Sequence, residues 1–363
     1  MPQPIAAFTA DNHLRPTTWT KHPDLHSDAF VSWHQIIDHC VAAKLPLIQL
    51  GDLFDSERPD SLSVGHYLHG VHKLREAGVA FYYIEGNHDR ADPPWASLTP
   101  YAVPLGQTAI AGVPFYGISY RRADELPDAL AAVPPATRVL LCHQSWREIQ
   151  RVGDCQGTFG QIPHGLVLLS GDYHVCETYT GTAMNGEKVT AYSPGSTAMQ
   201  DLAEWPLKFF GILHDDLSVV WKQIDTRPYV EHTCDSEENM AELIGRMAGL
   251  YNNHERRLHP DIQKPILRIK YDSSIPEAYD RLTAAAGTMY HLFLEPRHKV
   301  NNQVVDVVAL PAAATQTLRA ALRTLSPSEA VYQAAIRLMD TTDLKAEIEA
   351  MFNEQKAAEQ LAP

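Results

Sequence analysis

Five short apolar runs in the first half of the chain each end in Asp, Asn or His. Each run has the length and composition of a buried strand. Open α/β sheets bind their ligands at the carboxyl ends of the strands, so five polar clusters at that end predict one shared site. The five clusters are Asp11-Asn12-His13, Gly51-Asp52-Leu53-Phe54-Asp55, Gly86-Asn87-His88-Asp89, His143 and Gly171-Asp172-Tyr173-His174.

Carboxylates, imidazoles and an amide gathered in this way form a set of metal ligands. Two cations about 3.5–4 Å apart need a carboxylate shared between them, and neutral imidazole and amide ligands keep such a pair electrophilic. The pair would bind a scissile phosphate and activate water for in-line attack. The sequence therefore predicts a two-metal phosphoesterase site.

Composition narrows the class of protein. The 363 residues are 45% apolar and 20% charged, which is ordinary for a globular protein. We expect no membrane span and no signal peptide, because no apolar run is long enough for the first and no basic region precedes the short one at the N-terminus. Five cysteines without CxxC spacing are expected to be reduced thiols of a cytoplasmic protein. A formal charge of −14 argues against a broad basic track for nucleic acid.

The order of predicted elements indicates the fold class. Helices at 27–44 and 60–77 alternate with the first three strands, whereas strands dominate from about 110 to 225. Two layered sheets fit this order better than one doubly wound sheet. The expected class is α/β, a two-layered β-sheet sandwich flanked by helices.

A boundary is expected near 225–228, where the sequence reads Asp-Thr-Arg-Pro and a new pattern starts. We expect a domain at 1–228, a small α+β domain at 229–310 and a helical tail at 311–363. The elements predicted beyond the boundary are helices at 237–257 and 276–286 and strands at 266–271, 290–295 and 303–309.

The five motifs, in this order and spacing, resemble the calcineurin-like metallophosphoesterase family over residues 1–200. The resemblance implies the metallophosphoesterase fold for the first domain and two divalent ions as cofactors. It implies that the first metal is held by Asp11, His13, Asp52 and His174. It implies that Asp52 bridges to a second metal, held also by Asn87, His143 and Asp172.

One position departs from the family pattern. Nuclease members usually have Gly-His-x-His where this chain has Gly171-Asp172-Tyr173-His174. Aspartate can ligate a metal in place of histidine, so Asp172 is kept as a ligand. A carboxylate there favours Mn²⁺, with Mg²⁺ as the alternative, over Zn²⁺.

Three residues beside the ligands are expected to support the chemistry. His88 follows a ligand directly and is the candidate to stabilise or protonate the leaving oxygen. Asp55 and Asp89 are expected to orient ligands or cap turns. The helical histidines at 66, 69 and 72 fan round their helix, and no metal is expected there.

Further motifs resemble the SbcD-type DNA repair exonucleases. Residues 51–55 are similar to the GDLFD of that type, and the turn at 192–196 with the strand after it matches its glycine-serine turn. The domain at 229–310 sits where that type carries a DNA-capping domain, and the tail resembles helices that bind an SMC-like ATPase. The resemblance implies a DNA exo/endonuclease subunit in DNA end processing, repair or recombination. The implied assembly is a homodimer within a complex with an SbcC-type ATPase.

Contacts with DNA and with the ATPase are expected at two kinds of surface. Two adjacent arginine pairs could bind DNA phosphates, Arg121-Arg122 and Arg256-Arg257. The alternative is that these arginines are ordinary solvated surface residues. An apolar stripe in the last helix could dock the ATPase or pack on its own domain. The stripe is formed by Leu344, Ile348, Met351 and Phe352.

Two other functions fit the same motifs. One is hydrolysis of a small nucleotide or a phosphomonoester, which would need neither a partner nor residues beyond 230. The other is an architectural subunit that bridges DNA ends and the ATPase, with hydrolysis incidental. Loss of a metal ligand would leave that architectural function intact.

Overall fold

The computed structural model of the protein describes residues 2–19, 22, 25–150, 154–250 and 258–297. The chain divides into two compact units, Met1–Arg297 and His298–Pro363, and only the first is described below. The strand expected at 303–309, the helical tail with its apolar stripe at Leu344, Ile348, Met351 and Phe352, and the pair Arg256-Arg257 lie outside the described residues.

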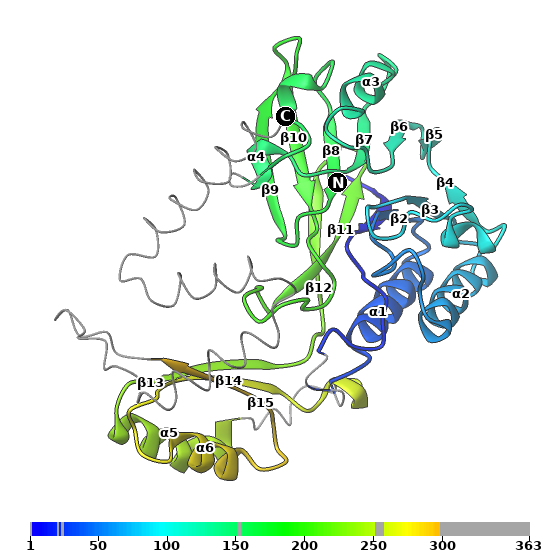
Figure 1. The fold of residues 1–363 in the computed structure, drawn as a ribbon. Coiled ribbons are helices and arrows are strands. Elements are labelled where there is room, and N and C mark those ends of the chain that lie inside the picture. The colour runs from blue at the N-terminus through cyan, green and yellow to red at the C-terminus, as the bar shows by residue number, and fades with distance from the viewer. Residues whose placement is uncertain (1, 20–21, 23–24, 151–153, 251–257, 298–363) are drawn as a thin grey trace, which may run out of the picture. The chain divides into compact units, whose positions relative to one another are not determined.

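Two six-stranded sheets form the body of the described unit (Figure 1). The first has the order β12-β11-β1-β2-β3-β4, with β1 to β4 parallel and β11 and β12 antiparallel. Its strands are β1 (Pro4–Thr9), β2 (Leu47–Leu50), β3 (Phe81–Ile84), β4 (Ala102–Pro104), β11 (Lys208–His214) and β12 (Val219–Ile224).

The second sheet has the order β5-β6-β7-β8-β10-β9, with parallel pairing from β6 to β10 and antiparallel hairpin partners at both edges. Its strands are β5 (Gln107–Ile110), β6 (Val113–Ile118), β7 (Val139–His143), β8 (Val167–Gly171), β9 (Glu177–Thr182) and β10 (Lys188–Ser193). Strands β4, β5 and β9 were not predicted from the sequence.

The two sheets pack face to face. One buried cluster joins Phe8 and Leu50 of the first sheet to Phe115 and Leu141 of the second. Because each sheet contributes its inner face to one core, the expected two-layered sandwich is confirmed. The ends of β1, β2 and β3 thereby come close to the ends of β7 and β8.

Helices cover the outer faces. α1 (Asp28–Ala43) and α2 (Ser61–Glu76) lie side by side on the first sheet, where Trp33, Tyr67 and Phe81 share a buried cluster (Figure 1). A separate cluster on the second sheet includes residues of α3 (Leu126–Ala131) and α4 (Arg147–Gln150). Three short 3-10 helices are η1 (Trp95–Leu98), η2 (Phe159–Gln161) and η3 (Pro260–Ile262). None of the described helices is long and apolar enough to cross a membrane.

A third sheet follows the expected boundary. Its order is β13-β14-β15, all parallel, and α5 and α6 supply the two crossovers. The elements are β13 (Tyr229–Cys234), α5 (Glu237–Leu250), β14 (Ile266–Asp272), α6 (Ala278–Ala286) and β15 (His291–Arg297). The sequence predicted a helix at the start of this unit and did not predict β13, which contributes only one buried residue, Cys234. We call residues 229–297 the small unit.

A half-buried histidine pair joins α1 to α2. His34 Nε2 lies 2.8 Å from His66 Nδ1. Burial first, and then the nearby His66, His69 and Lys73, lower the pKa of His34 to about 4 against the opposing effect of Asp38. An unfolded chain would protonate this histidine near pH 6.5. Between pH 6.5 and 4 the unfolded state therefore binds more protons, and acidification destabilises the fold.

We accordingly expect His34→Gln to reduce the loss of stability on acidification. After discounting for solvent screening of this half-exposed group, the expected difference is about 1 kcal/mol. Urea unfolding of metal-free protein at pH 7 and at pH 4.5 measures it, and His72→Gln, an exposed histidine on α2, is the control. Equal pH dependence in wild type and His34→Gln would contradict the assignment.

Candidate metal centre

The predicted site residues lie on turns at the carboxyl ends of five strands. Several of these turns require a left-handed backbone, with φ of 48° at Asp11, 43° at His13, 53° at Asp52 and 80° at Asp172. Such conformations are costly for residues other than glycine and concentrate at functional sites. The turns therefore hold polar side chains at a fixed place at the expense of local stability.

Three of the predicted ligands converge on one point. His13 Nε2 lies 3.3 Å from His174 Nε2, and His174 Nε2 lies 3.9 Å from Asp11 Oδ1. One potential ligand atom from each of the three residues lies within 4.8 Å of the others. Asp11 and His13 are buried, whereas His174 is partly exposed.

The other four predicted ligands form a second group, in which Asp52, Asn87 and Asp172 surround His143. Its Nε2 lies 3.1 Å from Asn87 Oδ1, 3.4 Å from Asp52 Oδ2 and 3.8 Å from Asp172 Oδ1. Asp52 Oδ2 is also 3.7 Å from His13 Nε2 in the first group. The Asp52 carboxylate thus lies between the two groups, where a shared ligand would have to be.

The charge balance of the site fits divalent cations. Burial would raise the pKa of Asp52, but His143 and then His13 outweigh it, and the pKa falls well below its usual range. Burial lowers the pKa of His143, and the carboxylates of Asp52, Asp11 and Asp172 reverse this and raise it well above normal. Three carboxylates gathered around imidazoles call for positive charge. All seven donors are oxygen or nitrogen, which suits Mn²⁺ or Mg²⁺.

Each predicted histidine ligand has a partner on its outer side. His143 Nδ1–H donates to the carbonyl of Leu50 at 2.8 Å, so its Nε2 faces the site. His174 Nδ1 lies 2.7 Å from Glu204 Oε1, and His13 Nδ1 lies 3.2 Å from Asp55 Oδ1. Such outer partners fix the ring and its tautomer and tune a metal ligand.

Close packing around these side chains requires glycine at two turns. A Cβ added to Gly51 would lie 2.3 Å from His143 Nδ1. A Cβ added to Gly86 would lie 2.0 Å from Asp52 Oδ1. The glycines of the two motifs therefore leave room for the ring of one predicted ligand and the carboxylate of another.

His88 is exposed and lies at the edge of the site. Its backbone N–H donates to Asp52 Oδ1 at 2.9 Å, and its Nδ1 lies 3.0 Å from the carbonyl of Asp55. Potential ligand atoms of His13, Asp55 and His88 also come within 4.8 Å of one another. His88 could thus act on a leaving oxygen or bind an ion, and the metal content of a variant separates the two.

The buried Asp89 connects the turn after β2 to the turn after β3. Its carboxylate accepts the backbone N–H of Gly86 at 2.8 Å and that of Leu53 at 2.7 Å. Burial, followed by the charge of Asp52, raises the pKa of Asp89 to about 6. Its geometry is that of a turn-capping residue.

Sequence reasoning missed several residues that hold the site. The side-chain amide of Gln49, inside β2, bonds to Asn12 and to both backbone groups of Gly51. Glu204 lies in the loop between β10 and β11 and belongs to no motif. Its i,i+4 spacing to Lys208 was the only available signal, and such spacing is common on any surface.

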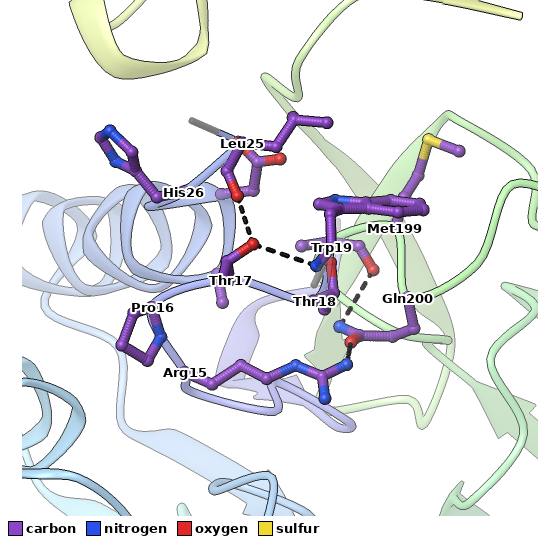
Figure 2. Close-up of a pocket in the computed structure, with 12 residues that line it drawn as sticks. Arg15, Pro16, Thr17, Thr18, Trp19, Leu25, His26, Met199 and Gln200 are labelled. Carbon is purple, nitrogen blue, oxygen red and sulfur yellow. Dashed lines mark hydrogen bonds between the residues drawn. The ribbon is translucent and has the colours of Figure 1, made fainter. Parts of the chain in front are cut away.

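The segment after His13 lines a small pocket beside the centre (Figure 2). Arg15 there forms an ion pair with Asp55 and donates to Gln200 Oε1 at 2.8 Å. Trp19 N–H donates to Thr17 Oγ1. Through Arg15, the turn that carries Asp11 and His13 is connected to the loop after β10.

Of the two arginine pairs, Arg121-Arg122 lies within the described residues, and its two members have different surroundings. Arg122 pairs with Asp124 and Glu125 on the surface, which fits the solvated alternative. Arg121 shares a groove of about 640 Å³ with Arg90, which directly follows the turn-capping Asp89. The groove also contains acidic residues. None of the five cysteines forms a disulfide.

Comparison with known proteins identifies relatives. The chain is 26% identical over 266 residues to the DNA double-strand break repair protein Mre11 of Methanosarcina acetivorans, covering 65% of this chain and 41% of the relative. It is 24% identical over 237 residues to Mre11 of Haloferax volcanii, covering 61% and 52%. The chain is similar to Mre11. A third Mre11, from Methanosarcina mazei, is 26% identical over 259 residues, covering 65% and 41%.

The Mre11 similarity confirms the resemblance to metallophosphoesterases of the DNA repair type that the motifs indicated. The matched region spans about half or less of the length of these Mre11 relatives. No protein-family model matches the chain.

Proposed function

We propose that the chain is a two-metal DNA exo/endonuclease subunit that hydrolyses phosphodiester bonds in DNA end processing, repair or recombination. The observation that carries the proposal is the convergence of three carboxylates, three imidazoles and one amide at the facing strand ends of two sheets. Similarity to three Mre11 proteins supports DNA as the substrate.

The proposed ligand sets are those that the family resemblance implies. Asp11, His13, Asp52 and His174 would hold one ion, and Asp52, Asn87, His143 and Asp172 the other. The two ions, proposed as Mn²⁺ with Mg²⁺ as the alternative, would bind the scissile phosphate and activate the attacking water.

The remaining residues would orient and transfer protons. The Asp55 carbonyl accepts a hydrogen bond from Nδ1–H of His88. Nε2 of this exposed ring would carry the second proton of the imidazolium form and donate it to the leaving oxygen. The Asp55 carboxylate would orient His13, and Asp89 would hold the two turns in register.

The proposed assembly contains DNA and an SMC-like ATPase of SbcC type, with the chain as a homodimer within the complex. Its domains would be the nuclease domain at 1–228, a capping domain that contacts DNA at 229–310 and an ATPase-docking tail at 311–363. Arg121, together with Arg90, is the described candidate for phosphate contact. Five cysteines without a disulfide are compatible with a cytoplasmic location.

A nuclease assay tests this proposal. End-labelled duplex and single-stranded DNA are incubated with the purified chain in Mn²⁺ or Mg²⁺, with and without the co-encoded ATPase. Metal-dependent cleavage that the ATPase stimulates is expected. Full activity on a model phosphoester with none on DNA would instead favour the small-substrate alternative. DNA-end bridging that survives loss of hydrolysis would favour the architectural one.

A substitution at Asp172 tests the unusual ligand. Asp172→His is expected to keep activity within roughly tenfold, to tolerate Zn²⁺ better and to lower the pH at which the rate half-rises. The reason is that an ion with one carboxylate fewer is a stronger Lewis acid. Asp172→Ala should empty the second position while the first stays filled. Rate profiles against pH and the metal content of both variants measure this, and two bound ions in Asp172→Ala would contradict the assignment.

A further inference from the structure

A carboxylate outside every predicted motif holds one of the proposed ligands. Glu204 Oε1 lies 2.7 Å from Nδ1 of His174 and accepts a hydrogen bond from it. A neutral imidazole carries a single N–H, so this bond assigns the proton to Nδ1 and the free lone pair to Nε2. Nε2 is the atom that lies near His13 and Asp11.

The second oxygen of Glu204 is fixed by three donors. Oε2 accepts from Lys208 Nζ at 2.6 Å, from Ser196 Oγ at 3.1 Å and from the backbone N–H of Gln200 at 3.1 Å. The Lys208 side chain is only 3% exposed and that of Glu204 15% exposed. A buried ammonium needs its carboxylate, so the pair fixes the orientation of Glu204.

The loop that carries Glu204 also meets the small unit. The Leu202 carbonyl accepts from Arg268 Nη1 at 3.0 Å and from Tyr229 Oη at 3.3 Å. The guanidinium of Arg268 is held in turn by Glu231 and Glu295. Leu202 lies only two residues before Glu204. The loop therefore connects strands of the small sheet, through Glu204, to the proposed metal ligand His174.

We propose that Glu204 is a positioning residue for His174, locked by Lys208 and anchored by Arg268 through Leu202. This inference rests on the proposed function only in taking His174 as a metal ligand. Glu204 itself lies on the outer side of the ring and does not contact the reacting atoms. By fixing the tautomer and the direction of the ring, it raises the affinity of one metal position and not of the other.

Titration of the full-length chain with Mn²⁺, followed by electron paramagnetic resonance, tests the proposal without an activity assay. In Glu204→Gln one of the two ions should bind roughly 10–100-fold more weakly, while the other keeps its wild-type affinity. Asp201→Asn is the matched control, because its carboxylate lies in the same loop but contacts Ala203 N–H. Unchanged affinity at both positions, or equal loss at both, would overturn the proposal.

A second pair of variants tests the anchor. Arg268→Met should weaken the same ion by a smaller factor, and Arg281→Met, which removes an ion pair with Glu237 elsewhere in the small unit, should not. Wild-type affinity in Arg268→Met would exclude the anchoring role.

A measurement on the wild type covers the case in which Glu204→Gln does not fold. In metal-free protein with ¹⁵N-labelled histidine, NMR at a pH where the His174 ring carries a single proton should find that proton on Nδ1, in a strong hydrogen bond. A proton on Nε2 would overturn the proposal. Failure of the wild type to bind any Mn²⁺ would instead reject the proposed function, so the two failures are distinguishable.

Discussion

Asp52→Ala is expected to abolish hydrolysis and to release both metal ions. Oδ2 of Asp52 lies between His13 Nε2 and His143 Nε2, at 3.7 and 3.4 Å, so one carboxylate faces both groups of proposed ligands. Its other oxygen accepts the N–H of His88 and helps to hold that turn. Asp11 Oδ1 approaches both groups less closely, at 3.9 Å from His143 Nε2 and 3.9 Å from His174 Nε2.

Metal content after dialysis and the rate of DNA cleavage measure the effect of Asp52→Ala. Asp38→Ala is the control, since it removes an exposed carboxylate on α1 that pairs with Lys73. The control should keep both ions and full activity. Retention of two ions in Asp52→Ala would show that another group bridges them.

His88→Ala is expected to reduce turnover by roughly 10²–10⁴-fold while the metal content stays near that of the wild type. The ring is exposed, and its Nδ1 is bonded to the Asp55 carbonyl, which leaves Nε2 free for the leaving oxygen. A proton donor contributes to the rate without contributing to the affinity for metal.

The same two measurements serve for His88→Ala, with His72→Ala as the control at an exposed histidine paired to Glu76. Loss of an ion from His88→Ala would contradict the assignment. It would make His88 a ligand together with His13 and Asp55, whose potential ligand atoms lie close enough for that arrangement.

The sequence predicted the sandwich and the convergence of the site because both depend on strand ends. Apolar runs identify buried strands, and the polar residue that follows each run marks its carboxyl end. Parallel pairing aligns the ends of β1, β2 and β3 in one sheet and of β7 and β8 in the other. Packing of the two sheets against each other then brings Asp11, Asp52 and His143 together. No knowledge of loop conformation was needed for this step.

Residues that act through long-range packing could not be predicted in the same way. Glu204 follows His174 by thirty residues and reaches it only because a loop folds back over the end of β8. β13 was missed because only one of its residues, Cys234, is buried in the core of the small unit. A segment with a single buried residue lacks the apolar pattern of a strand and resembles a linker. β9 pairs at a sheet edge and has one buried side chain, so it carries little apolar signal.

The left-handed backbone of the ligand turns could not be predicted from the sequence either. The left-handed conformations of Asp11, His13 and Asp52 are unusual for residues with a side chain. Local propensity would place glycine or asparagine at such positions. Four of the nine non-glycine residues with positive φ in the described part of the chain are proposed ligands, and a functional site is where a conflict between local preference and function is expected.

The most direct test of the two-metal account is the electron paramagnetic resonance spectrum of the full-length chain loaded with Mn²⁺. The account predicts two Mn²⁺ ions per chain whose spectrum shows mutual spin coupling, since ions about 3.5–4 Å apart that share a carboxylate must interact. A single uncoupled Mn²⁺ per chain, or none, would contradict it.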